Sequence, residues 1–146
     1  MPLLNYTTSI NADRTIQEIQ SCLARHGAKA IINEYDDNGY IIALSFAIEL
    51  NDQKIGFKLP CDWRPVQQIL EKDRKVPKRL KTQEQALRVA WRIIKDWVDA
   101  QMAIVETKMV KIEEVFLPYA VQRNGRTLYE NTVESGMLLN AGLEEK

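Results

Sequence analysis

The amino-acid sequence predicts an α+β domain: a three-stranded antiparallel meander, an N-terminal helix, a short helix, one long helix and a C-terminal β-hairpin. Two observations carry this prediction. Apolar and polar residues alternate through residues 29–59, as in a half-buried sheet, whereas from Thr82 to Glu106 the apolar residues recur every three or four positions. The sheet has one apolar face, and the helices are expected to cover it.

The chain has 146 residues, enough for one domain whose core needs neither a metal nor a disulfide. We expect a single domain over residues 1–130 and a tail over residues 131–146 that is flexible or ordered only by contact with a partner. The formal net charge is zero, which excludes a global basic field for nucleic acid and leaves only local patches.

The first residues lack a basic segment followed by an apolar core, and no apolar run approaches membrane length. We therefore expect a protein of the cytoplasm, without a membrane partner, in which Cys22 and Cys61 stay reduced. Cys22 and His26 share a helical face, but one such pair is a weak metal signal. We predict no metal site and no cofactor.

The first helix is predicted over Ala12–His26. Asn11 or Asp13 caps its start, and Gly27 supplies the left-handed residue that ends it. The inward stripe of this helix consists of Ile16, Ile19 and Leu23.

Three strands follow, over Lys29–Tyr35, Tyr40–Leu50 and Gln53–Leu59. The turns between them, Asp36–Gly39 and Asn51–Asp52, are short and rich in residues that tolerate positive φ, which favours an antiparallel meander. The predicted inward face of the last two strands consists of Tyr40, Ile42, Leu44, Phe46, Ile48, Leu50, Ile55, Phe57 and Leu59.

A short helix begins at Asp62 or Trp63 and runs to about Lys72. After it, residues 72–81, which we name the basic connector, lead into the long helix. The basic connector holds six cations in ten residues, interrupted by Pro77: Lys72, Arg74, Lys75, Lys78, Arg79 and Lys81.

The long helix, Thr82–Glu106, has two adjacent apolar stripes and only a narrow charged strip. A helix so broadly apolar must be covered on two sides, either by the sheet and a second helix or by the same helix of another subunit. Three of its residues are candidates for an oligomer interface: Trp91, Trp97 and Ile104.

Beyond the long helix, Pro118 ends a second short apolar segment. The dipeptide Asn124-Gly125 suits a type I′ turn, so we expect a β-hairpin between Tyr119–Gln122 and Thr127–Tyr129.

The basic connector is the strongest functional signal. With the charged strip of the long helix it could form a phosphate-binding surface, because arginine offers a planar fork and lysine a point charge. The candidate ligand residues are Arg74, Lys75, Lys78, Arg79, Lys81, Arg88 and Arg92. Trp63 is the candidate for stacking on a base. The alternative is a connector that is charged only because it is solvated.

Signatures of enzymes are missing from the sequence. It contains no glycine-rich phosphate loop, no His-Glu-x-x-His, no nucleophile elbow and no Cys/His pair with an orienting group. We therefore predict a protein without catalytic residues.

Five segments together carry a resemblance to known proteins: Asn5–Thr8, Asp37–Gly39, Ala90–Met102, Val115–Tyr119 and Gly125–Glu130. They resemble a family of small uncharacterised proteins encoded by bacteriophages and prophages. The resemblance implies a setting: a mobile genetic element that acts in the cytoplasm of a bacterial host cell. Small non-enzymatic proteins in that setting commonly bind nucleic acid, block a host defence protein or sequester a nucleotide immune signal.

Two hypotheses of function follow. In the first, an oligomeric phage-type protein binds a phosphate-bearing anion, either nucleic acid or a nucleotide signal, through the basic connector. In the second, a protein inhibitor or adaptor docks on a host defence or DNA-metabolism protein through the long helix and the C-terminal hairpin. A homodimer of long helices, with a ligand between subunits, is a third possibility.

Overall fold

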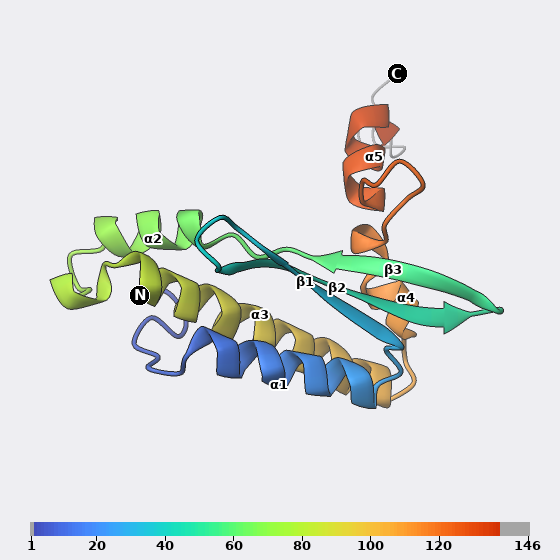
Figure 1. The fold of residues 1–146 in the computed structure, drawn as a ribbon, viewed down its shortest axis with the longest axis horizontal. Coiled ribbons are helices and arrows are strands. Elements are labelled where there is room, and N and C mark those ends of the chain that lie inside the picture. The colour runs from blue at the N-terminus through green and yellow to red at the C-terminus, as the bar shows by residue number, and fades with distance from the viewer. Residues whose placement is uncertain (1, 138–146) are drawn as a thin grey trace, which may run out of the picture.

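The computed structural model describes residues 2–137. A three-stranded sheet lies on a layer of two helices, α1 and α3, while α2 packs against the start of α3 (Figure 1). The elements are α1 (Ala12–Arg25), β1 (Ala30–Tyr35), β2 (Ile41–Leu50), β3 (Gln53–Leu59), α2 (Trp63–Lys72), η1 (Lys78–Leu80), α3 (Gln83–Glu106), α4 (Ile112–Val115), η2 (Leu117–Tyr119) and α5 (Leu128–Ser135). The predicted α+β architecture is confirmed.

The ends of α1 follow from its capping residues. The Asn11 side chain accepts a hydrogen bond from the backbone N–H of Asp13 at 3.0 Å. Gly27, with φ +104°, adopts the left-handed conformation that ends the helix. Ile16, Ile19 and Leu23 are buried against the sheet and α3, as predicted.

The sheet has the order β1-β2-β3 and is antiparallel throughout, so the meander is confirmed. Asn51 and Asp52, at φ +53° and +63°, form the tight turn between β2 and β3. The predicted inward face was wrong at one residue, Ile42. Where the pairing with β1 shifts register, between Glu34 and Tyr35, the alternation of β2 breaks and leaves Ile42 39% exposed.

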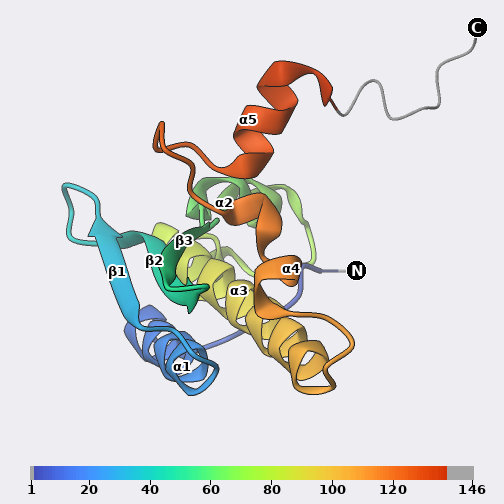
Figure 2. The same cartoon turned by 90° about the vertical axis from the view of Figure 1, so that its right-hand side faces the viewer.

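The long helix α3 is covered by its own chain. It runs beside α1 in the same direction beneath the sheet (Figures 1 and 2). Trp91, Val98 and Met102 are buried between these layers, and the Trp91 Nε1–H donates to the backbone oxygen of Ile41 at 3.3 Å. The sheet and the neighbouring helices of the same chain cover α3, as in the first of the two predicted arrangements.

The basic connector is packed rather than loose. Val76 and Leu80 are buried in a second apolar cluster with Leu70 of α2 and Ala86 of α3. These two apolar residues hold the connector in place, and the last part of it forms the short helix η1. Its cations are therefore presented from a defined backbone.

The predicted C-terminal hairpin is not supported. Gly125, at φ +82°, does form a turn, and Val121 pairs with Thr127 in an isolated bridge, but from Leu128 onward the chain is helical. A capping box explains the change. The Thr127 side chain accepts from the N–H of Glu130, whose carboxylate accepts from the N–H of Thr127.

Helix α5 crosses the predicted boundary between the domain and the tail at residues 130 and 131. It stands apart from the helix layer, on the other side of the sheet (Figures 1 and 2). The rest of the predicted tail, residues 138–146, lies outside the described residues.

Candidate functional site

A cavity of about 320 Å³ lies where the N-terminal segment, η1 and the first turns of α3 meet. We name it the arginine pocket. Its lining consists of Thr7, Thr8, Ser9, Arg79, Leu80, Thr82, Gln85 and Arg88. Two of the predicted ligand residues, Arg79 from the basic connector and Arg88 from α3, are thus brought to one cavity.

Gln85 builds one wall of the arginine pocket. Its side chain is only 3% exposed, and its Nε2 group donates to the backbone oxygens of Tyr6 and Thr8, each at 2.9 Å. Its Oε1 atom accepts from Arg88 at 3.3 Å. One buried amide therefore fixes the N-terminal segment and orients the Arg88 guanidinium.

The lining of the arginine pocket is suited to an anion. It contains two guanidinium groups and, among the described residues, no carboxylate. Thr82 caps the start of α3, so the positive end of the helix dipole points to the same place. Hydroxyl groups of Thr7, Thr8 and Ser9 complete the lining with further donors.

The other predicted ligand cations are held elsewhere. The Lys81 Nζ group donates to the backbone oxygen of Glu71 at 3.1 Å. Arg92 forms an ion pair with Glu18 at 2.7 Å, in a separate groove between α1 and α3. The three cations Arg74, Lys75 and Lys78 are exposed on the basic connector.

The predicted aromatic and interface residues differ in burial. Trp63 is half-buried against the second apolar cluster, which leaves only part of its ring for stacking. Trp91 is fully buried within one chain and presents no surface to a second copy. Trp97 is half-buried and lies edge-on to Phe116 and Tyr119, with each pair of ring centroids 5.5 Å apart. Ile104 is half-buried on α3.

One row of side chains superficially resembles a catalytic triad of nucleophile, base and orienting acid: Cys22, His26 and Glu106. The sulfur of Cys22 is 3.9 Å from Nδ1 of His26, but that nitrogen is 2.7 Å from the Cys22 backbone oxygen. Burial, followed by the charge of Asp99, raises the pKa of the Cys22 thiol. A buried thiol held in its neutral form is a poor nucleophile.

His26 instead ties the end of α1 to the end of α3. Its Nε2 atom is 2.7 Å from the Glu106 carboxylate, so both ring nitrogens face acceptors. The imidazolium form has two N–H donors and satisfies both. The Cys22 carbonyl, and after it the Glu106 carboxylate, raises the pKa of His26 above its ordinary value of 6.5.

This raised pKa predicts a pH-dependent stability. His26 stabilises the fold fully below its ordinary pKa, and the contribution is lost as the pH rises through the folded-state pKa. The difference in unfolding free energy between the native chain and His26→Gln should therefore be larger at about pH 5.5 than at about pH 8.5. Urea denaturation at the two pH values measures it, and Glu106→Gln should reduce the pH dependence in the native His26 background. A difference that does not change with pH would contradict this role.

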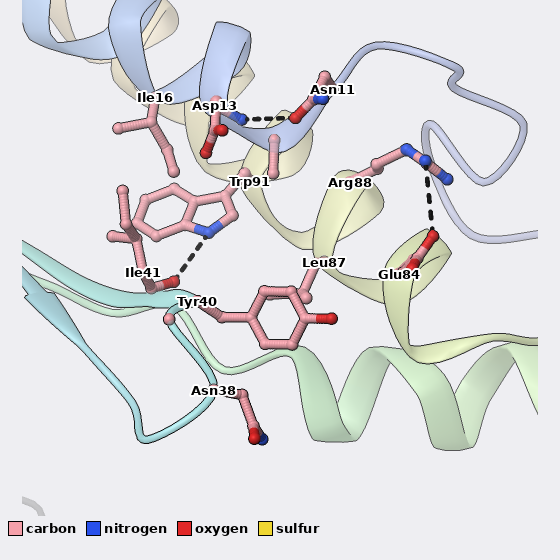
Figure 3. A pocket seen from close by; sticks show the side chains of 12 residues that line it. Asn11, Asp13, Ile16, Asn38, Tyr40, Ile41, Glu84, Leu87, Arg88 and Trp91 are labelled. Carbon is pink, nitrogen blue, oxygen red and sulfur yellow. Dashed lines mark hydrogen bonds and ion pairs between the residues drawn. The ribbon is translucent and has the colours of Figure 1, made fainter.

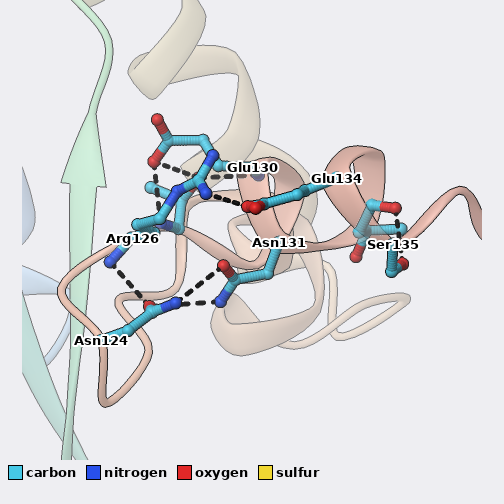
Figure 4. A network of polar contacts seen from close by, with 8 residues as sticks. Asn124, Arg126, Glu130, Asn131, Glu134 and Ser135 are labelled. Atoms are coloured by element: carbon cyan, nitrogen blue, oxygen red, sulfur yellow. Dashed lines mark hydrogen bonds and ion pairs between the residues drawn. The ribbon is translucent and has the colours of Figure 1, made fainter.

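The C-terminal helix α5 is joined to the preceding turn by a polar network (Figure 4). Asn124 and Asn131 exchange amide hydrogen bonds at 3.0 and 3.3 Å, and Arg126 pairs with Glu134. The Thr127 N–H lowers the pKa of the Glu130 carboxyl group. This network orders α5 locally, while Tyr129 and Val133 remain exposed.

Sequence reasoning missed Thr7, Thr8, Ser9 and Gln85. No local pattern marks them, because Gln85 meets the N-terminal segment across 77 residues of sequence. Over residues 2–137 no helix is long and apolar enough to cross a membrane, and no group of three metal-ligating side chains gathers.

Comparisons with protein-family models, curated proteins and solved structures found no match to this chain.

Proposed function

We propose that this chain is a non-enzymatic binding protein that takes a phosphate-bearing small molecule, a nucleotide, in the arginine pocket. The observation that carries the proposal is the convergence of Arg79 and Arg88 on a cavity whose described lining holds no carboxylate. Guanidinium groups bind phosphate oxygens through paired, charge-assisted hydrogen bonds, and the start of a helix adds backbone donors.

Size and charge favour a small ligand over a nucleic-acid polymer. A cavity of about 320 Å³ falls in the range of small-molecule sites. The net charge of zero gives no long-range attraction for a polyanion, and Arg92, one of the predicted ligand cations, is paired with Glu18 in a separate groove.

The resemblance to phage-encoded proteins extends this proposal to a role. A protein that binds a nucleotide without transforming it lowers the free concentration of that nucleotide. Sequestration of a nucleotide signal of host defence is the role that fits such chemistry, and it rests on the resemblance alone.

Binding of inorganic pyrophosphate tests the proposal, because this probe carries phosphate oxygens and no base. Isothermal titration calorimetry at low salt should show a single site. Arg79→Ala and Arg88→Ala should each weaken binding by about 10- to 100-fold, the effect of losing a hydrogen bond to a charged group. Higher salt should weaken the binding by the native chain, because the site is open to solvent.

Matched controls lie on the same connector. Lys75→Ala and Lys78→Ala remove the same charge from exposed positions outside the pocket lining, so the affinity should change little. If these lysine variants weaken pyrophosphate binding as much as Arg79→Ala, the attraction is a diffuse surface field and the pocket is not the site.

A second candidate function is docking on a protein partner, and the exposed face of α5 favours it. Tyr129, Val133 and Met137 are 56%, 48% and 69% exposed on or beside this helix. Because α3 is largely covered by its own chain, the docking surface moves from the long helix to α5. Tyr129→Ser together with Val133→Ser should abolish self-association or partner capture, measured by light scattering and by pull-down.

A further inference from the structure

A second cavity, of about 370 Å³, lies next to the arginine pocket (Figure 3). We name it the carboxylate pocket. It is an open cavity between the start of α1, the turn between β1 and β2, and the first turns of α3. Its lining consists of Asn11, Ala12, Asp13, Ile16, Asn38, Gly39, Tyr40, Ile41, Glu84, Leu87, Arg88 and Trp91.

The two cavities share Arg88. In Figure 3 this side chain extends from α3 away from Tyr40, and it lines the arginine pocket as well. The segment Thr7–Ser9 borders one cavity and the segment Asn11–Asp13 borders the other. A single ligand that contacts Arg88 can therefore place one end in each cavity.

The carboxylate pocket differs in charge from the arginine pocket. Asp13 and Glu84 bring two carboxylates to its rim, against the one guanidinium of Arg88. Within residues 2–137 the Asp13 carboxylate accepts no hydrogen bond, and Glu84 is held only by Arg88 at a long 3.9 Å. These oxygens are available to accept hydrogen bonds from a ligand, and Tyr40 adds an aromatic ring to the lining of the same cavity.

A ligand that matches both cavities has an anionic end and an end rich in N–H donors. A nucleotide has this form, but the possible bases differ in the pattern of hydrogen-bond donors and acceptors along their edges. The Watson–Crick edge of guanine presents two adjacent donors, N1–H and the exocyclic amine, which a carboxylate accepts as a pair. Adenine, cytosine and uracil each place an acceptor beside their donor, and a carboxylate repels that acceptor.

We propose that the carboxylate pocket recognises the guanine base of a nucleotide whose phosphates occupy the arginine pocket. The inference rests on the proposed function, which supplies the phosphate site. Glu84 or Asp13 accepts the two donors of guanine, Arg88 contacts the sugar-phosphate side, and the ring of Tyr40 covers part of the base.

Calorimetry of the full chain with GDP, ADP, UDP and pyrophosphate tests this. GDP should bind at least about tenfold more tightly than ADP and UDP, because the wrong base leaves an acceptor facing a carboxylate. The double variant Asp13→Asn/Glu84→Gln should remove this preference while pyrophosphate still binds at least as tightly as it does to the native chain, because loss of the Glu84 charge frees Arg88 from its ion pair. Both positions are exposed, so the variant should fold normally, as circular dichroism can verify.

Two controls separate this inference from the function on which it rests. Glu49→Gln removes an exposed carboxylate on β2, outside the lining of both cavities, and should leave the GDP preference intact. Arg79→Ala should weaken all three nucleotides and pyrophosphate alike.

Equal affinities for GDP and ADP, with pyrophosphate still bound, would overturn the guanine inference alone. Failure of pyrophosphate and of every nucleotide to bind would overturn the proposed function itself.

Discussion

Replacing Trp91 with alanine is expected to lower the free energy of unfolding by about 3–5 kcal/mol, the usual range for removing a large buried aromatic side chain. Trp91 is 0% exposed and lies in the core that joins α1, α3 and the sheet. Its truncation also leaves the Ile41 carbonyl without the indole donor. Because domains are stable by only roughly 5–15 kcal/mol, this variant should be close to unfolding at 25 °C. Urea denaturation followed by circular dichroism measures the loss.

Trp97→Ala is the matched control on the same helix. Trp97 is half-buried, so its truncation removes less area from water and should cost clearly less than Trp91→Ala. The pair also distinguishes a core residue from an interface residue. If Trp91→Ala leaves the unfolding free energy unchanged and instead changes the mass in solution, Trp91 acts at an oligomer interface.

Gln85→Met is expected to cost about 2–3 kcal/mol and to weaken pyrophosphate binding by more than about tenfold. Methionine keeps most of the volume of glutamine but removes the amide. The backbone oxygens of Tyr6 and Thr8 then lose their donor in a partly buried place, and Arg88 loses the acceptor that orients it. Thermal unfolding and calorimetry report the two effects on one protein sample.

Gln83→Met is the control for this substitution. Gln83 is a neighbouring glutamine at the first position of α3, and within the described chain its side chain makes no hydrogen bond to the N-terminal segment. Both stability and binding should stay close to those of the native chain. Equal losses in the two variants would show that helix propensity, and not the Gln85 amide, sets the effect.

The fold was predictable where local patterns decide the structure. The Asn11 cap, the Asn51–Asp52 turn and the alternation through β3 each specify a conformation over a few residues, and each lies where the sequence places it. The hairpin failed for a local reason as well. Asn124-Gly125 correctly marked a turn, but the capping box of Thr127 and Glu130 starts a helix immediately after it.

The candidate site was only partly predictable. The predicted ligand cations were visible in the sequence, yet of these the arginine pocket is lined only by Arg79 of the basic connector and Arg88 of α3. Buried Val76 and Leu80 fix how the connector presents Arg79. The carboxylate pocket was not foreseen. Asp13, Tyr40 and Glu84 come from three separate elements, and no spacing along the chain relates them.

Hydrophobic periodicity, capping residues and turn residues were enough to specify the helices, the meander and the apolar face on which they meet, because these depend on neighbours within a few positions. Tertiary packing alone decided that the chain covers its own long helix, and that Arg88 stands between a cationic and an acidic cavity. The interaction between two charged groups depends on their distance in space, which their separation along the chain does not give. Their partners, and hence the chemistry of the site, emerge only when α1, α3 and the N-terminal segment are packed together.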